Sequence, residues 1–263
     1  MDWWEDWWKI PEICWEVLKF IRYREVAFIC VNDPRQTRRF INIITYGNLI
    51  YRLKQYYYYK RNNLFHFFAS IERVKKSNDQ GTVYNLKRNW NVIGWDLVID
   101  LDGKGQTFDE RIQNAYQQAK LLKEVMDSYE LPYAIVFSGS KGFHFWIPWE
   151  HLRIFFKPQD YGAVNRKIAM FLAKQAGIKI DPSTLSTGKD LIRVPYSPHP
   201  ITKLIALPLT DDQFENFHYA MANPVNVLNL ELKNRGMLFR EGKLDNLIKE
   251  VFESDYKTEV QNI

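Results

Sequence analysis

The chain has 263 residues, 46% of them hydrophobic and 25% charged, which is enough apolar material for one large domain or two small modules. Its formal net charge of +5 favours an anionic partner, with nucleic acid as one candidate among several. The two cysteines, Cys14 and Cys30, exclude a disulfide framework and a four-cysteine zinc site, and we expect both to be buried thiols.

The N-terminal segment, residues 1–23, is rich in tryptophan and lacks the basic stretch and unbroken apolar run of a secretory signal. No part of the chain approaches the ~20 consecutive apolar residues of a membrane span, so we expect a cytoplasmic protein without membrane association. We expect a helix at roughly residues 3–22, split by Pro11. The tryptophans at positions 3, 4, 7 and 8 have helical spacing, and we expect them to pack onto the protein itself rather than to face a partner or a membrane.

The next part of the chain alternates between strand and helix patterns. We predict strands at 24–31, 38–44 and 64–71, and a helix at 46–59. Candidates for contact with nucleic acid are the aromatic and basic run 56–63 and the basic residues Arg73, Lys75, Lys76, Lys87 and Arg88 around a loop at 77–81. Helix packing and a solvated face explain these residues equally well, and we interpret His66 and His218 as structural.

The rest of the chain continues this alternation. Strands are predicted at 94–103, 134–137, 143–147, 178–181, 191–196 and 203–209, and helices at 108–129, 164–175, 212–221 and 244–254. Thr107 and Glu110 have the spacing of a capping box for the first of these helices, and Gly177 follows the end of the second. The pattern predicts an α/β or α+β protein with a mixed sheet.

The predicted strand 94–103 ends in two acids. Side chains alternate across a strand, so Asp100 and Asp102 project from the same face, with Cα atoms roughly 6.5–7 Å apart. Two carboxylates at this spacing suit a pair of hard divalent cations such as Mg²⁺ or Mn²⁺. A strand end with solvated acids is the alternative interpretation.

A polar turn separates the two following strands. The glycines of 138–142 permit unusual backbone angles and close approach of a ligand, and the backbone N–H groups of such a turn form an anion-binding nest. Lys141 adds a positive charge, and His144 shares a strand face with Trp146. We interpret the stretch as a phosphate-binding turn that differs from a Walker loop, with a plain hairpin as the alternative.

A third group of polar residues lies at 180–202. Asp181 ends a short apolar segment, Arg193 lies within a predicted strand, and Ser197 and His199 follow in a proline-rich turn. An arginine, a serine and a histidine near an acid are typical ligands of a triphosphate beside a metal ion.

The order and spacing of these three groups resemble the archaeo-eukaryotic primase superfamily, especially the small catalytic subunit of primase. "VIDLD", "SGSKGFHFW" and "IDPSTLSTGKDLIRVPYSPHP" are similar to its three motifs, and the resemblance covers about residues 24–208. It implies an α/β module packed on an RRM-like module with the site between them. We expect one catalytic core over 1–263, with the motifs in 24–210 and a helical segment at 211–263.

The resemblance also implies roles for individual residues. Asp100, Asp102 and Asp181 would hold two Mg²⁺ or Mn²⁺ ions. The incoming triphosphate would be bound by Ser138, Lys141, His144, Arg193, Ser197 and His199, together with Arg39. The implied function is a DNA-dependent primase-polymerase, of the kind found on plasmids or beside CRISPR genes, which makes and extends primers by two-metal nucleotidyl transfer. Its partners would be single-stranded DNA template, NTPs or dNTPs, and a large primase subunit or fused accessory domain, in a nucleoid-associated setting.

Two departures from the family pattern qualify this expectation. Ile201 stands where family members often carry a lysine, and Lys203 is the nearest substitute. The 36 residues between His144 and Asp181 contain no cysteine, so no zinc is expected. A repair-type polymerase that extends primers without initiating them, and an inactive nucleic-acid-binding module, are the alternatives. Tyr196 is a candidate for the contact that selects the sugar.

Overall fold

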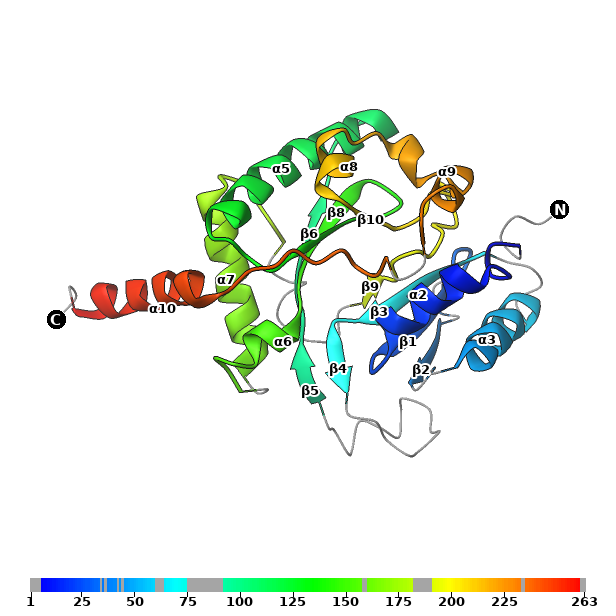
Figure 1. Cartoon of the computed structure of the whole chain (residues 1–263), viewed down its shortest axis with the longest axis horizontal. Coiled ribbons are helices and arrows are strands. Elements are labelled where there is room, and N and C mark those ends of the chain that lie inside the picture. The colour runs from blue at the N-terminus through cyan, green and yellow to red at the C-terminus, as the bar shows by residue number, and fades with distance from the viewer. Residues whose placement is uncertain are drawn as a thin grey trace.

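The computed structural model describes residues 6–33, 35, 37–41, 43, 45–59, 64–74, 92–157, 160–181, 191–232 and 235–260. In these residues two four-stranded sheets are joined by a two-stranded ribbon, with helices around them (Figure 1). The predicted α/β (α+β) class is confirmed. All strand pairings of named strands that the structure describes are antiparallel, whereas we expected a sheet of mixed direction.

The first sheet has the order β2–β1–β3–β9, in which the last strand comes from the C-terminal half of the chain. The strands are β1 (Glu25–Cys30), β2 (Thr37–Ile41), β3 (Phe65–Ser70) and β9 (Leu191–Arg193). Helices α2 (Pro11–Ile21) and α3 (Tyr46–Tyr59) pack together and share one apolar core with Phe28 and Phe67 of this sheet. Because side chains alternate along a strand, His66 and Phe68 of β3 point to the opposite face.

The second sheet has the order β10–β7–β8–β6. Its strands are β6 (Leu97–Asp102), β7 (Ala134–Phe137), β8 (Gly142–Ile147) and β10 (Leu207–Leu209). The long helix α5 (Phe108–Ser128) packs on β6 and β8, where the ring of Tyr116 contacts Phe143, and α7 (Tyr161–Gln175) packs against α5 and β6. The predicted strands at 134–137 and 143–147 are confirmed.

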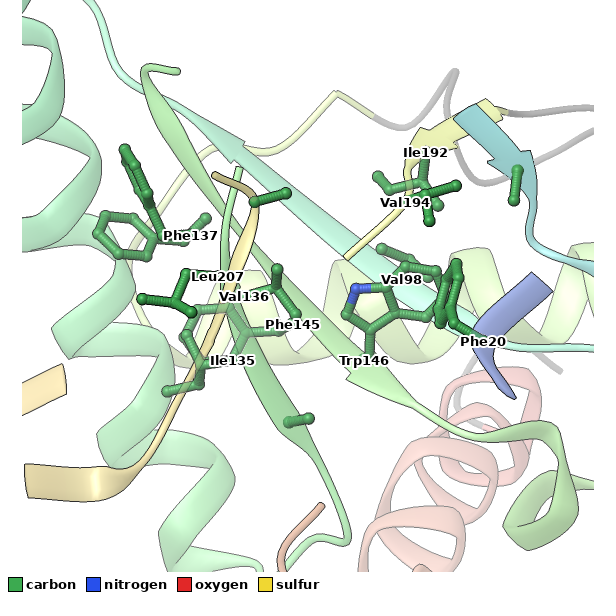
Figure 2. Close-up of a cluster of buried hydrophobic side chains, with 14 of the residues drawn as sticks. Phe20, Val98, Ile135, Val136, Phe137, Phe145, Trp146, Ile192, Val194 and Leu207 are labelled. Atoms are coloured by element: carbon green, nitrogen blue, oxygen red, sulfur yellow. The ribbon is translucent and has the colours of Figure 1, made fainter. Parts of the chain in front are cut away.

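The two sheets share one apolar core. Figure 2 shows Ile192 of β9, and Val194 just after it, beside Val98 of β6 and Trp146 of β8. Phe20 of α2 meets Trp146 edge to face, with ring centroids 5.2 Å apart. Residues from the N-terminal helix and from the C-terminal half of the chain therefore fix how the sheets face each other.

The predicted strand 94–103 is broken at Asp96. The structure has two strands here, β5 (Val92–Trp95), which pairs with β4 (Glu72–Val74) in the ribbon, and β6 in the second sheet. The break lies where the backbone N–H of Asp96 donates to the carbonyl of Ile71, at 3.1 Å, between β3 and β4. The chain passes from one sheet to the next at this point.

Buried charges explain why the chain breaks at Asp96. Its carboxylate forms ion pairs with Arg24 and, at 3.5 Å, with Arg73, and it accepts a hydrogen bond from the N–H of Trp149. The buried Asp96 carboxylate keeps a pKa below its usual value because these cations outweigh the opposing effect of burial. Arg73 therefore belongs to the junction between the sheets, and the interpretation of Arg73 as a template contact or a solvated side chain is wrong.

The N-terminal tryptophans that the structure describes pack on the body of the protein, as predicted. Trp7 and Trp8 are 2% and 5% exposed, and Nε1 of Trp7 donates to the carbonyl of Tyr196 at 3.0 Å. Pro11 begins α2 at its first turn, where a proline needs no hydrogen-bond partner, and so divides the predicted helix.

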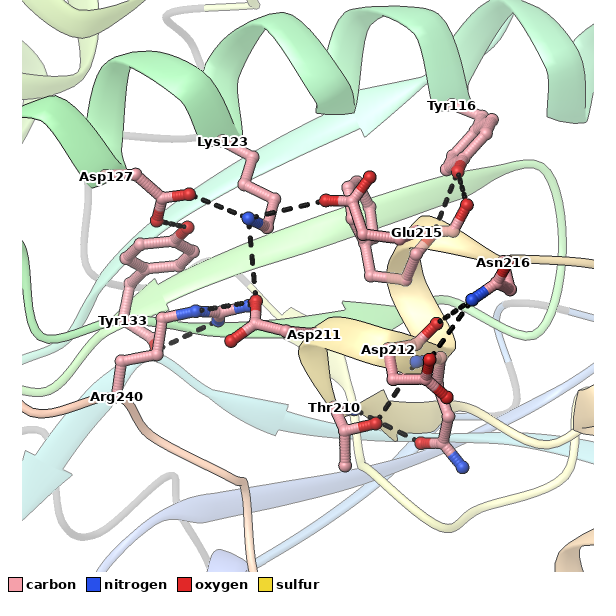
Figure 3. Close-up of polar contacts among 12 residues, drawn as sticks. Tyr116, Lys123, Asp127, Tyr133, Thr210, Asp211, Asp212, Glu215, Asn216 and Arg240 are labelled. Carbon is pink, nitrogen blue, oxygen red and sulfur yellow. Dashed lines mark hydrogen bonds and ion pairs between the residues drawn. The ribbon is translucent and has the colours of Figure 1, made fainter.

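Salt bridges hold the segment after β10 against α5, the helix that packs on the second sheet. Figure 3 shows Lys123 of α5 between Asp127, Asp211 and Glu215, with Nζ–O distances of 2.7, 3.5 and 3.4 Å. Arg240 forms a further ion pair with Asp211. These pairs hold α8 (Asp211–Glu215) and the chain around residue 240 against α5.

The C-terminal elements differ partly from prediction. In place of one helix at 212–221 there are α8 and η3 (Tyr219–Ala222), because Asn216 ends the first, and Nδ1 of His218 caps the second by accepting from Ala220. Residues 178–180 are irregular rather than a strand. The remaining elements are α6 (Trp149–Leu152), α9 (Pro224–Leu228) and α10 (Asp245–Val260), which projects from the body in Figure 1. In the described ranges, no helix is both long and apolar enough to cross a membrane.

The capping box at the start of α5 gives a direct test of local stability. Thr107 Oγ1 accepts from the N–H of Glu110, and the Glu110 carboxylate accepts from the N–H of Thr107. We expect Thr107→Ala to lower the free energy of unfolding by about 1 kcal/mol, because it leaves a helix N–H without its partner. Urea unfolding measures this, with Thr107→Ser as the control that keeps the hydroxyl. Equal stability of the alanine and serine variants would contradict the expectation.

Candidate active site

Two carboxylates stand at the end of β6, on the face that the alternation predicts. Asp100 pairs with His144 of β8, and Asp102 pairs with Gly142. Residues opposite each other in an antiparallel pair point to the same face, so Asp100, Asp102 and His144 lie on one face of the second sheet. His144 also shares this face with Trp146, as expected.

Asp100 has a buried oxygen that lacks a hydrogen bond. Its Oδ1 has no hydrogen-bond partner in the described residues, and Nε2 of His144 lies 3.5 Å away. Burial, and secondly the charge of Asp102, raise the pKa of Asp100 to about 7, while Lys141 acts to lower it. The side chain as a whole is 32% exposed, so it is open to solvent on one side. A hard divalent cation would satisfy this oxygen and favour the ionised form, and Asp100 with Asp102 therefore fits such an ion.

The third predicted metal ligand is Asp181. It is exposed and follows the irregular stretch 178–180. The described parts of the chain contain no group of three or more His, Cys, Asp and Glu side chains that could hold a metal ion. The strand register thus brings Asp100 and Asp102 together. Residues 182–190 lie outside the described residues, and the part of Asp181 in the site stays a prediction.

The turn 138–142 is held by its own serine. Ser138 Oγ accepts from the N–H groups of Ser140 and Gly142, at 3.3 and 3.2 Å, so two N–H groups of the predicted anion nest are already engaged. Gly139 has φ +75°, and a Cβ there would lie 2.9 Å from the carbonyl oxygen of Leu204. A Cβ on Gly142 would lie 2.4 Å from that of Leu101. Backbone packing therefore explains both glycines, but it does not explain Lys141 or His144.

Lys141 and His144 both face the acid pair. Nζ of Lys141 lies 2.8 Å from Oδ2 of Asp102, and both side chains are about half exposed. His144 is buried, and its Nδ1 has no hydrogen-bond partner in the described residues. Burial, and secondly the charge of Arg193, lower the pKa of His144 to about 3, so its ring is neutral near pH 7.

Arg193 carries a buried positive charge that contacts His66 and also acts on the imidazoles of His144 and His199. Its Nη2 lies 2.8 Å from Nδ1 of His66, and its guanidinium stands over the ring of Phe68, 4.9 Å from the centroid. Burial lowers its pKa to about 9, so it remains charged near pH 7. Its Nη1 is buried without a hydrogen-bond partner, and no carboxylate in the described residues forms an ion pair with it. An anionic ligand would supply the missing partner.

The loop after β9 carries the predicted ligands Ser197 and His199. Nδ1 of His199 accepts from the N–H groups of Ile201 and Thr202, at 3.3 and 3.1 Å. Ser197 is fully buried, and its hydroxyl donates to the carbonyl of Val194 at 2.5 Å. Both side chains shape the loop in this structure, and their contact with phosphate stays a prediction. Burial is the largest factor that lowers the pKa of His199 to about 3, ahead of Arg193 and His66.

A hydrogen bond from the hydroxyl of Thr202 links the loop after β9 to the turn 138–142. Thr202 Oγ1 donates to the carbonyl of Gly139 at 2.5 Å. The same oxygen accepts from the N–H of Leu204 at 3.3 Å. We expect Thr202→Val, which keeps the shape and removes the hydroxyl, to lower the free energy of unfolding by about 1 kcal/mol because the Gly139 carbonyl and the Leu204 N–H lose their partner. Urea unfolding tests this against Thr202→Ser, which keeps the donor. Equal stability of the valine and serine variants would show that the Thr202 hydroxyl does not stabilise the fold.

Other residues considered from sequence lie away from this group. Arg39 is exposed on β2 and pairs with Glu25 at 2.8 Å. The strand register places Arg39 and Arg193 in one row across the first sheet, three strand spacings or roughly 14 Å apart, and a contact of Arg39 with the triphosphate stays a prediction. Tyr196 is buried and its hydroxyl donates to the carbonyl of Gly236, which places it in the core rather than beside a sugar. Lys75, Lys76, Lys87, Arg88, residues 60–63 and the side chains of 56–59 lie outside the described residues.

His66 joins the group although we interpreted it as structural. It lies 2.8 Å from Arg193, and its ring centroid is 5.2 Å from that of His199. The sequence carried one signal of this position, a histidine in the otherwise apolar strand "LFHFFA". The partner could not be read from it, because Arg193 is 127 positions away in the chain.

Comparison with known proteins places the fold. No protein-family model and no curated protein matches this sequence. Among solved structures, the polymerase domain of Mycobacterium tuberculosis ligase D in complex with DNA matches with a TM-score of 0.55 and 15% identity, over 95% of this chain and 88% of that one. The catalytic domain of primase RepB′ in complex with initiator DNA aligns over 96% and 98%, with a TM-score of 0.46 and 9% identity. The protein therefore has a fold in common with the ligase D polymerase domain.

Proposed function

We propose that this protein is a nucleotidyltransferase of the primase-polymerase type, acting on a single-stranded DNA template. The observation that carries the proposal is a pair of unsatisfied groups around His144, which lies 3.5 Å from Asp100 and feels the charge of Arg193. Among the described residues, a buried oxygen of Asp100 and a buried guanidinium nitrogen of Arg193 have no hydrogen-bond partner. A metal-bound triphosphate supplies a cation to the first and an anion to the second, and it is the common substrate of such enzymes.

The residues near His144 divide between these two charges. Asp100 and Asp102, with Asp181, would hold Mg²⁺ or Mn²⁺. When bound, these ions activate the attacking 3′-hydroxyl and neutralise the pyrophosphate leaving group. Arg193 and Lys141 orient the phosphates through charge-assisted hydrogen bonds. The neutral ring of His199 keeps its proton on Nε2, because Nδ1 accepts two backbone hydrogen bonds, and so offers one more donor.

Primer synthesis tests the proposal directly. Circular single-stranded DNA offers no free end, so any labelled product requires initiation, and an annealed primer on the same circle reports extension. Ribo- and deoxyribonucleotides are supplied separately, with Mg²⁺ or Mn²⁺, and Asp100→Asn/Asp102→Asn is the control. We expect products from the wild type and none from the double variant.

The pattern of products separates the proposal from its rivals. Extension without initiation would identify a repair-type polymerase, or one that needs a start-site partner such as a large primase subunit. Template binding without product in either assay would identify an inactive binding module and overturn the proposal. Products that the double variant also makes would show that the acid pair is not the reaction centre.

A further inference from the structure

We propose that His66 is a positioning residue that aims the guanidinium of Arg193 at the phosphates of the substrate; this rests on the nucleotidyltransferase function proposed above. The two side chains stand on neighbouring strands, His66 on β3 and Arg193 on β9, where Arg193 is directly opposite Phe68. His66 and Phe68 are two residues apart on the same face of β3. One strand thus supplies two contacts to the arginine of the next.

The hydrogen bond between the two residues has a defined direction. A guanidinium has donors and no acceptor, so Nδ1 of His66 must accept from Nη2 of Arg193, at 2.8 Å. His66 is therefore neutral, with its proton on Nε2. Burial, and secondly the charge of Arg193, lower the pKa of His66 to about 4, which is consistent with a neutral ring.

Phe68 completes the support for Arg193. The guanidinium stands 4.9 Å from the Phe68 ring centroid, and the His66 and Phe68 rings are stacked with centroids 5.6 Å apart. An unsupported arginine samples many rotamers, and fixing one terminal nitrogen and one planar face leaves few. The other terminal nitrogen, Nη1, has no hydrogen-bond partner in the part of the chain that the structure describes. The contacts thus restrain one side of the guanidinium and leave the other for an anion.

Two nearly isosteric variants separate positioning from packing. His66→Asn places an amide oxygen where Nδ1 lies, so the acceptor remains, whereas His66→Leu keeps the branched shape and removes it. Binding is measured calorimetrically with an α,β-imido nucleoside triphosphate and Mn²⁺, which binds without reacting. We expect the asparagine variant to bind within about threefold of wild type and the leucine variant about tenfold more weakly. In primer extension, His66→Leu should raise KM for nucleotide by a similar factor and change kcat by less than about threefold.

Coupling to Arg193 gives a second readout that a structural role would not produce. In an Arg193→Gln background, His66→Leu should weaken triphosphate binding no further, because there is no guanidinium left to aim. Additive losses in the two variants would overturn the inference, as would wild-type binding by His66→Leu. If the leucine variant does not fold, His66→Gln replaces it, since its amide lies beyond the position of Nδ1, and the same tenfold loss is expected.

The order of measurement keeps this inference distinct from the proposed function. Failure of the wild-type protein to bind the imido triphosphate would overturn the function and, with it, this inference. Binding by the wild type together with unchanged binding by His66→Leu would overturn the inference alone. Template affinity should be the same in all variants, because the variants change only the contact to Arg193.

Discussion

Asp100→Asn should reduce nucleotide incorporation by roughly 10³-fold or more while making the metal-free protein more stable. The loss follows because an amide oxygen without charge is a weak ligand for Mg²⁺ or Mn²⁺. The gain in stability follows because the buried Oδ1 has no hydrogen bond to lose within the described ranges. A substitution that lowers activity and raises stability identifies a side chain whose role is to bind a ligand and not to stabilise the fold.

The stability effect has a definite pH dependence. The folded pKa of Asp100 is raised to about 7, above that of the unfolded chain, so the folded state favours the neutral acid. Ionisation of Asp100 therefore does not lower the free energy of unfolding below about pH 4. The loss grows between about pH 4 and about pH 7, and it stays constant above that range. Because a third of the side chain is exposed, we expect Asp100→Asn to gain about 1–2 kcal/mol at pH 8 and nothing near pH 4.

Urea unfolding without metal at these two pH values, and primer extension with Mn²⁺, measure the two effects. Asp109→Asn is the matched control, since Asp109 is an exposed acid in the first turn of α5, and it should leave incorporation unchanged. An Asp100→Asn variant that incorporates nucleotide at the wild-type rate would remove Asp100 from the active site. A variant that is less stable at pH 8 would show that the carboxylate has a structural partner.

Arg193→Met should weaken triphosphate binding by about 10²-fold, the effect expected when a desolvated charge loses its partner anion. Methionine fills much of the same volume and removes a buried charge that has no carboxylate partner in the described residues. The variant is therefore expected to unfold at a urea concentration equal to or above that of wild type. Calorimetry with the α,β-imido triphosphate measures binding.

Arg193→Lys is the control for geometry. It keeps the charge but loses the planar fork of donors, so it should bind the triphosphate with an affinity between those of wild type and Arg193→Met. Equal binding by the lysine variant and wild type would mean that charge alone is needed, and equal binding by the methionine variant would remove Arg193 from the site.

Local patterns in the sequence predicted the parts of the site that depend on short-range geometry. Strand alternation placed Asp100, Asp102 and His144 on one face because the period of a strand is set by the backbone. The same reasoning extended the strand through Asp96, which the structure breaks. The partner that explains the break, Arg24, is 72 positions away, and no periodicity reports on a contact of that range.

The surroundings of Arg193 were beyond prediction for a related reason. Residue types alone suggested that an arginine, a serine and a histidine share an anion. In the structure, the hydroxyl of Ser197 is bonded to the backbone, and His66 of β3 contacts Arg193 instead. That histidine and the serine at the end of the strand are the polar residues of β3. Which polar groups a loop uses for its own turns, and which it leaves for a ligand, depends on tertiary hydrogen bonds that sequence spacing does not encode.

The placement of β9 has a consequence for how the protein is made. The edge of β3 pairs with a strand whose residues leave the ribosome more than a hundred positions later, so β3 stays an open edge in the nascent chain for most of synthesis. Such a high contact order slows folding. The contact of Trp7 with the carbonyl of Tyr196 spans a still longer separation of 189 positions. The order of synthesis thus completes the surroundings of Arg193 late, and a chain stopped before residue 191 would leave that edge of β3 unpaired.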